Sequence, residues 1–200
     1  MQHRAIITRR KILESAVTAF AHNGFNGTTV DSIADSAGVN KQRIYAYFGS
    51  KKKLFEAALL EVFLRVKMFG NSTLEKCERN PEQLNRIVLS SFLQVHEQQP
   101  VLWRLLAWAN LEGGDCVNVL ESARNDENNA LRKIFDLAVA NKFIKPVKFE
   151  KWLFILLGIS CFYYSNRSTL AHTHDRCIAE DDWKAELISD VDMLLSEKLS

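Results

Sequence analysis

Polar side chains that can hydrogen-bond to nucleic-acid bases and phosphates gather between residues 28 and 51 of the 200-residue chain. Amide side chains such as Asn40 and Gln42 can pair bidentately with adenine, and Lys41 or Arg43 can pair with guanine. Hydroxyl groups and a lysine near a helix start suit phosphates, which position a protein on DNA. We expect Lys41, Gln42 and Arg43 to contact base edges. The complete set of expected DNA contacts is Thr28, Thr29, Asn40, Lys41, Gln42, Arg43, Tyr45, Tyr47 and Lys51.

A compact pair of helices is needed to present these side chains together. A helix-turn-helix has a small residue where its helices cross, a residue that tolerates positive φ in the turn, and apolar residues on the second helix. Ala34, Gly38 and Ile44 supply these features at matching offsets. The sequence therefore predicts a helix-turn-helix over about residues 29–48. A tight helical hairpin without DNA contact is the alternative.

The rest of the chain also shows helical periodicity. No stretch alternates apolar and polar residues between hairpin turns, so the sequence predicts an all-α fold. We expect the first helix to begin after Thr8 and to end at Gly24, with Thr28 or Thr29 as the N-cap of the second and Ser50 as that of the fourth. Further helices are predicted at about 29–37, 41–48, 51–69, 81–98, 100–112, 116–141, 149–171 and 182–198.

The first quarter of the chain is basic, although the whole chain has a net charge of only +2. Residues 1–53 hold nine Lys or Arg against three acids, a net of +6, whereas the remaining 147 residues hold 17 against 21, a net of −4. This asymmetry predicts a polyanionic partner for the first part and a different role for the rest. The alternative is a basic patch that is only solvated surface.

Composition and motifs argue against several other classes of protein. No apolar run reaches the length of a membrane span or signal peptide, so we expect a cytoplasmic protein without membrane contact. The four cysteines lack ligand-like spacing, which predicts neither disulfides nor a zinc site. His172, His174 and Asp175 could bind zinc or copper, but a surface loop is the preferred interpretation. No cofactor and no catalytic arrangement is indicated, so we do not expect an enzyme.

The segment ILESAVTAFAHNGFNGTTVDSIADSAGVNKQRIYAYFGSKKKLFEAAL, residues 12–59, resembles the N-terminal domain of the TetR family of bacterial transcriptional repressors. The resemblance implies a homodimer that binds a near-palindromic operator on double-stranded DNA and releases it when a small molecule enters a helical C-terminal domain. By motif position, the family's DNA contacts map onto eight of the nine residues given above, all except Arg43. The resemblance also implies a bacterial protein, nucleoid-associated when bound to DNA.

Several residues depart from the family pattern. Gln42 stands where many members have a small residue, which adds a base contact or alters how closely the helix approaches. Ala46 replaces a common Tyr, so one backbone contact is missing. Lys52 and Lys53 make the segment more basic than usual. The operator sequence therefore cannot be transferred from a relative.

The resemblance and the pattern together divide the chain into a DNA-binding domain, residues 1–50, and a larger helical ligand-binding and dimerisation domain, residues 51–200. The two are joined by the long helix at about 51–69. The helix at about 149–171 carries apolar residues on more than one side, and the helix at about 182–198 carries an apolar stripe. This favours a four-helix dimer interface over a purely intramolecular core. Aromatic and polar residues of the central helices suit an effector pocket, although plain packing is the alternative. The candidates are Phe92, His96, Trp103, Leu106, Trp108, Asn110 and Phe162.

Three functions remain open from the sequence. The preferred hypothesis is a DNA-binding repressor that a small-molecule effector releases from its operator. An orphan regulator of the same fold, without such an effector, is the nearest alternative. A small helical enzyme or adaptor protein is the alternative from another class, and it leaves the basic first quarter unexplained.

Overall fold

The computed structural model describes residues 2–66, 71–172 and 181–197. These residues form helices and turns, with one isolated β-bridge between Ile144 and Ser196 and no β-strand, so the predicted all-α fold is confirmed. The chain divides into two compact units, residues 1–67 with 99–124 and residues 68–98 with 125–200. This division by packing places residues 51–66 and 99–124 with the predicted helix-turn-helix.

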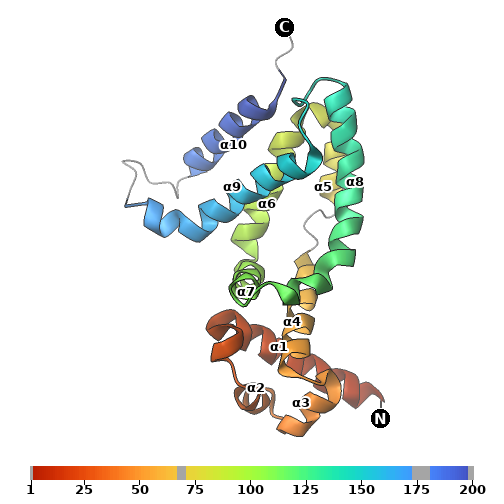
Figure 1. Ribbon diagram of the computed structural model, residues 1–200, viewed down its shortest axis with the longest axis vertical. Helices are drawn as coiled ribbons and strands as arrows, with labels where there is room; N and C mark the ends of the chain where they lie inside the picture. Colours follow the sequence, from red (N-terminus) through yellow and green to blue (C-terminus); the bar gives the residue numbers. More distant parts are fainter. Residues whose placement is uncertain (1, 67–70, 173–180, 198–200) are drawn as a thin grey trace. The chain divides into compact units, whose positions relative to one another are not determined.

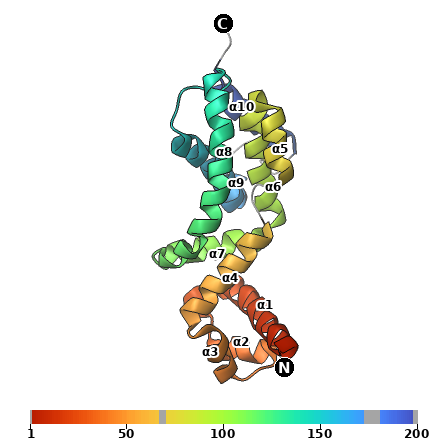
Figure 2. The same cartoon turned by 90° about the vertical axis from the view of Figure 1, so that its right-hand side faces the viewer.

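The described part of the first unit is built from helices (Figures 1 and 2). They are α1 (Gln2–Gly27), α2 (Val30–Ala37), α3 (Lys41–Phe48), α4 (Lys51–Val66), α7 (Pro100–Leu111), the 3-10 helix η2 (Asp115–Leu120) and the first turn of α8 (Glu121–Ala140). Aromatic rings hold α1 to α4 in the core, where Phe20 and Phe55 meet edge to face at 5.0 Å between centroids. Both rings are fully buried, so α4 is a rigid neighbour of the helices that precede it.

Helix α1 is longer than the sequence predicts at both ends. It begins at Gln2, and the Thr8 hydroxyl donates to the Arg4 carbonyl at 2.9 Å inside the helix, so the predicted N-cap at Thr8 is wrong. A threonine can satisfy its hydroxyl on the preceding turn, and it then does not end the helix. At Gly24 the backbone kinks with φ 70° and ψ −178°, and the helix resumes to Gly27. The predicted stop is therefore a kink.

The second unit contains the remaining helices (Figure 1). They are α5 (Asn71–Arg79), the 3-10 helix η1 (Pro81–Gln83), α6 (Leu84–Gln98), most of α8 (Glu121–Ala140), α9 (Phe149–Leu170) and α10 (Asp181–Leu195). Helix α6 packs along α9, and the fully buried Trp152 of α9 lies at their shared core with Phe135 of α8, 4.9 Å away between ring centroids. The sequence did not predict α5, and it placed the start of α8 in what is the 3-10 helix η2.

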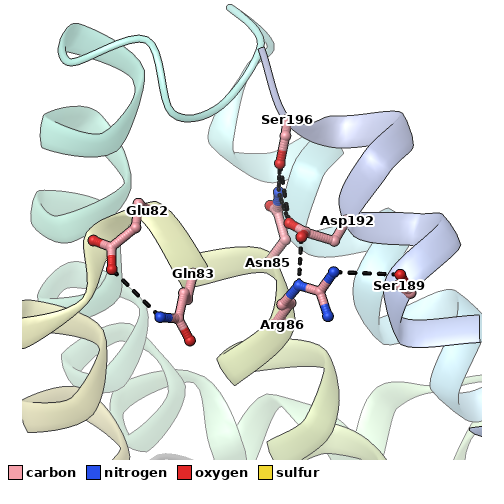
Figure 3. A network of polar contacts seen from close by, with 7 residues as sticks. All are labelled: Glu82, Gln83, Asn85, Arg86, Ser189, Asp192 and Ser196. Atoms are coloured by element: carbon pink, nitrogen blue, oxygen red, sulfur yellow. Dashed lines mark hydrogen bonds and ion pairs between the residues drawn. The ribbon is translucent and has the colours of Figure 1, made fainter. Parts of the chain in front are cut away.

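A polar network fastens α10 to α6 (Figure 3). The buried Asn85 accepts a hydrogen bond from Trp152 Nε1 at 2.8 Å and donates to Asp192 Oδ1 at 3.2 Å. Arg86 Nε lies 2.6 Å from Asp192 Oδ2. Because Asn85 forms hydrogen bonds with residues of both α9 and α10, this network determines how α10 packs on the second unit.

Candidate nucleic-acid interface

Local hydrogen bonds hold the turn between α2 and α3. Thr29 Oγ1 accepts from the Ser32 amide at 3.0 Å, so Thr29 and not Thr28 caps α2. Gly38 adopts the left-handed conformation, with φ 66° and ψ 39°, and ends α2 as predicted. Asn40 Oδ1 accepts from the Arg43 amide at 2.9 Å and caps α3. Each side-chain cap is worth about 1 kcal/mol of helix stability, and together they fix where α3 begins.

The inward faces of α2 and α3 contain the residues that the helix-turn-helix pattern requires. Ile33 and Ala34 of α2 are buried, as are Ile44 and Phe48 of α3. The predicted positions of Ala34 and Ile44 at the contact between the helices are confirmed, and Ile33 and Phe48 complete this interior. Helix α3 is therefore held by one face and leaves the other exposed.

The exposed surface of α3 comprises three stripes because successive residues of an α-helix turn by about 100°. Gln42 and Ala46 form the outermost stripe, opposite the buried pair Ile44 and Phe48, and both are exposed. Since Ala46 has only a methyl group, Gln42 is the one long side chain of this stripe. This is the position from which a helix in the major groove contacts base edges.

One flank of α3 is joined to α2 by a charged hydrogen bond. Lys41 Nζ lies 2.7 Å from Asp31 Oδ2, and this hydrogen bond raises the pKa of Lys41 above its ordinary value. Tyr45, one turn later on the same flank, is exposed. Lys41 must leave or share Asp31 to contact DNA, whereas the Tyr45 hydroxyl meets no such competition.

The opposite flank, Arg43 and Tyr47, faces the first turns of α1. Together with Arg4 and Thr8 these residues line a surface pocket of about 500 Å³. No sequence signal indicated Arg4, because the first helix was predicted to begin only after Thr8. The structure thus adds a second basic residue to the surroundings of Arg43.

Two of the predicted phosphate contacts lie in unexpected surroundings. Thr28 is only 1% exposed, and its hydroxyl donates to the Gly24 carbonyl at 2.7 Å, so this hydroxyl is a structural group and not a surface contact. Lys51 is half-buried, with Nζ 4.5 Å from the centroid of the Phe25 ring. The burial lowers the pKa of Lys51. The ring limits the directions in which this ammonium group can reach.

The predicted effector contacts are divided between the two units. Trp103, Leu106, Trp108 and Asn110 belong to α7 of the first unit, and the ring of Trp108 lies against Gly24 of α1. Phe92 and His96 are buried on α6 of the second unit. Phe162 is exposed on α9 and lines an apolar pocket of about 400 Å³. The other residues of this pocket are Gly158, Ile159, Tyr163, Leu170, Trp183 and Leu187.

The buried His96 is held by its neighbours within the second unit. Its Nδ1 lies 2.9 Å from the Phe92 carbonyl and 3.2 Å from the Ser160 hydroxyl, and its ring stacks on Tyr164 at 5.6 Å. Burial lowers the pKa of His96 to about 4, so the imidazole is neutral at physiological pH. A neutral imidazole can donate one hydrogen bond and accept another.

The possible metal ligands His172, His174 and Asp175 lie only partly within the residues that the structure describes. His174 and Asp175 lie outside the described residues, and His172 is exposed in the turn after α9. Across residues 2–66, 71–172 and 181–197, no group of three or more His, Cys, Asp or Glu could hold a metal ion. Over the same ranges no helix combines the length and apolar character needed to cross a bilayer.

Family models match most of the chain. A model of the bacterial regulatory proteins of the tetR family matches residues 12–58, which include α2 and α3. A model described as a tetracyclin repressor-like C-terminal domain matches residues 81–191. Proteins of this family are transcriptional regulators, in agreement with the expectation that the chain is not an enzyme.

Curated relatives share parts of the sequence to different extents. The chain is 27% identical over 186 residues to the HTH-type transcriptional repressor NicS of Pseudomonas putida, which covers 91% of this chain and 87% of that protein. It is 33% identical over 119 residues to the HTH-type transcriptional repressor SCO4008 of Streptomyces coelicolor, covering 60% of this chain and 58% of that protein.

Solved structures share the fold along nearly the whole chain. HlyIIR, a hemolysin II transcriptional regulator, superposes with a TM-score of 0.70 at 19% identity, covering 97% of this chain and 99% of that one. A TetR family transcription regulator from Marinobacter aquaeolei gives a TM-score of 0.68 at 21% identity, covering 99% and 100%. With the capped α2–α3 pair, its polar outer surface and both family models in agreement, the chain belongs to the tetR family of bacterial regulatory proteins.

Proposed function

We propose that this regulator is a repressor that binds a near-palindromic operator as a homodimer and leaves it when a small molecule binds. The observation that carries the proposal is the outer stripe of α3, where Gln42 projects opposite the buried Ile44 and Phe48. Two relatives, NicS and SCO4008, are transcriptional repressors by name, which favours repression over activation. Such a protein acts on the chromosome, so we expect it in the bacterial cytoplasm, bound to the nucleoid when it occupies its operator.

Residues 1–50 would bind DNA, with different roles for the stripes of α3. Gln42 is the main candidate for a base edge, because a glutamine pairs bidentately with adenine in the major groove. Thr29, Tyr45, Tyr47 and Lys51 would contact phosphates, with Lys41 and Arg43 on the flanks of Gln42. Asn40 already uses its side-chain oxygen to cap α3, so only its amide nitrogen is left for DNA.

Residues 51–200 would contain the dimer interface, formed by α9 and α10. Large apolar side chains are exposed on both helices: Phe154 is 76% exposed and Phe162 58%, while Met193 and Leu194 are 59% and 65% exposed. Exposed apolar patches of this kind mark protein contacts. A two-fold interface between identical α9 and α10 pairs would set two copies of α3 on the half-sites of a palindrome.

The effector site would lie among aromatic side chains of residues 51–200, the same part of the chain as the proposed dimer interface. The pocket at Phe162 has the apolar lining and the size of about 300–1,000 Å³ that small-molecule sites have. Phe92 and His96 of α6 do not line this pocket, so their contact with an effector stays a separate prediction. A mostly apolar compound with a hydrogen-bonding group is the chemical class that such side chains favour.

Release of DNA requires that a movement of the effector-binding part reach α3. Within the first unit, α7 and the residues after it are joined to α1 by the ring of Trp108 against Gly24 and by a hydrogen bond from Asn26 Nδ2 to Glu112 Oε2 at 2.7 Å. Only two residues separate the end of α3 from the start of α4. A ligand that favours a shifted α4 or α7 would thereby favour the DNA-free conformation.

The proposal is tested by selecting bound fragments from bacterial genomic DNA and measuring affinity for the recovered sequence. We expect affinity to fall steeply with salt concentration, because several phosphates are neutralised. Gln42→Ala should change base preference at one position of each half-site by about 1–3 kcal/mol. Lys51→Ala should weaken all sequences alike and serves as the comparison. Failure to enrich any sequence, or a salt-independent affinity, would refute DNA recognition.

Effector binding is tested separately by thermal unfolding in a panel of small metabolites. A binding compound should raise the unfolding temperature of the wild-type protein and lower its affinity for the selected operator. Phe162→Ala should remove the thermal shift if the pocket on α9 is the site, and Trp103→Ala gives the same test for α7. Should no compound bind while the operator is recognised, the protein is an orphan regulator.

A further inference from the structure

The pocket between the first turns of α1 and the flank of α3 contains an unusual set of donors. Arg4 and Thr8 lie one turn apart on α1, and Arg43 and Tyr47 lie one turn apart on α3. Each helix thus contributes one guanidinium group and one hydroxyl group to the pocket. Thr8 already donates to the Arg4 carbonyl, which leaves two guanidinium groups and the Tyr47 phenol as donors for a ligand. Ala5 and Ile7 complete the lining.

Both guanidinium groups lack a counter-ion within the part of the chain that the structure describes. No carboxylate is among the described residues that line the pocket, and neither Arg4 nor Arg43 forms an ion pair there. Five other cations of the first unit do have partners. Arg9 lies 5.0 Å from the Phe48 ring, Arg10 lies 3.7 Å from Glu14, Lys41 lies 2.7 Å from Asp31, Lys51 lies 4.5 Å from the Phe25 ring and Lys52 lies 3.8 Å from Asp115.

An oxyanion is the ligand that this donor set fits. A guanidinium group presents a planar fork of N–H donors that matches phosphate oxygens bidentately, and a phenol adds a single further donor. Two positive groups that face one pocket repel each other until an anion enters it.

We propose that this pocket binds a backbone phosphate of the operator, next to the base pairs that Gln42 contacts. The inference rests on the proposed DNA recognition and adds Arg4 of α1 to its contacts. It also assigns Arg43 to the phosphate backbone instead of a base edge, because Arg43 turns toward α1 and about 100° away from Gln42. The first two turns of α1, which lie before the residues matched by the family model, would thus be part of the DNA-binding surface.

The test compares Arg4→Gln with Arg10→Gln, using the full-length protein and the operator recovered by genomic selection. Both variants remove one positive charge from the exposed surface of α1, but Arg10 is not among the pocket residues. We expect Arg4→Gln to weaken operator and unrelated DNA by about the same factor and to reduce the slope of log K against log salt by about 1. Arg10→Gln should keep the wild-type slope. Equal effects of the two substitutions would overturn the proposal.

A neutral phosphate analogue locates the contact. A methylphosphonate placed at single positions of the operator should weaken the wild-type protein at one position per half-site and should weaken Arg4→Gln less at that position, because only Arg43 is then left to sense the charge. Arg43→Gln should show the same reduced sensitivity and no change in base preference. A base-specific effect of Arg43→Gln would overturn the assignment of Arg43. If the wild-type protein enriches no DNA, the proposal of DNA recognition fails. If the wild-type protein enriches an operator but Arg4→Gln behaves like Arg10→Gln, only the assignment of the pocket fails.

Discussion

Replacing Gly24 by alanine should destabilise the first unit by about 4 kcal/mol. Two separate costs contribute. The backbone at Gly24, with φ 70° and ψ −178°, is nearly exclusive to glycine, and any other residue there costs about 1–3 kcal/mol. A Cβ at this position would lie 2.7 Å from ring atoms of Trp108, an overlap that costs about 1–3 kcal/mol more. For a chain of this size the thermal midpoint would fall by roughly 10 °C.

Gly27→Ala is the matched control for this measurement. Gly27 has no positive φ, and its added Cβ would meet only the Cβ of Asn23 at 3.4 Å. We therefore expect a change within about 1 kcal/mol, in the stabilising direction. Chemical denaturation followed by circular dichroism gives both free energies of unfolding.

A double-mutant cycle separates the two costs of Gly24→Ala. Combining it with Trp108→Leu should recover the steric part, with a coupling energy of about 1–3 kcal/mol, but not the backbone part. Strict additivity of the two substitutions would show that the indole ring is not the obstacle. A neutral Gly24→Ala would refute both the kink and the contact.

Three further predictions concern the second unit. The pKa of His96 is lowered to about 4 in the folded protein from its ordinary 6.5, so on acidification the unfolded chain takes up the proton first. The free energy of unfolding therefore keeps its full value above pH 6.5 and falls by about 3 kcal/mol as the pH approaches 4. Denaturation of His96→Gln across this range should show a shallower loss, and an unchanged pH profile would contradict the assignment. Asn85→Ala leaves the Trp152 N–H without its acceptor and removes one donor from the Asp192 carboxylate, which keeps Arg86 and Ser196. It should cost about 2–3 kcal/mol, where the exposed Gln83→Ala costs less than about 0.5. Phe154→Glu, at a side chain 76% exposed, should leave folding intact and convert a dimer to monomers in sedimentation, whereas a wild-type monomer would refute the proposed interface.

The local features of the helix-turn-helix could be predicted from the sequence because their causes are local. Gly38 ends α2, and Ser50 Oγ accepts from the Lys53 amide at 3.1 Å, each through groups within four residues of one another. The Asn40 cap of α3 is equally local, although Asn40 was predicted only as a DNA contact. The burial of Ile44 follows from the same short segment. These features need no knowledge of distant parts of the chain.

The features that the sequence did not predict depend on distant residues or on a weak pattern. The Thr28 hydroxyl turns inward because Gly24 and Ala19 offer carbonyl oxygens to it. The pocket at Arg43 exists only because α1 continues back to Arg4. Helix α5, with the sequence NSTLEKCER, carries too few apolar residues to produce a periodic signal, although Cys77 is buried.

The pairing of a long Gln42 with a short Ala46 on the outermost stripe of α3 has an evolutionary consequence. Neither side chain supports the hydrophobic interior, so substitutions at these two positions leave folding almost untouched. After gene duplication, a copy could acquire a new target site through one or two such exchanges while keeping its sensor. Diversification of regulatory circuits would then proceed without any period of structural instability.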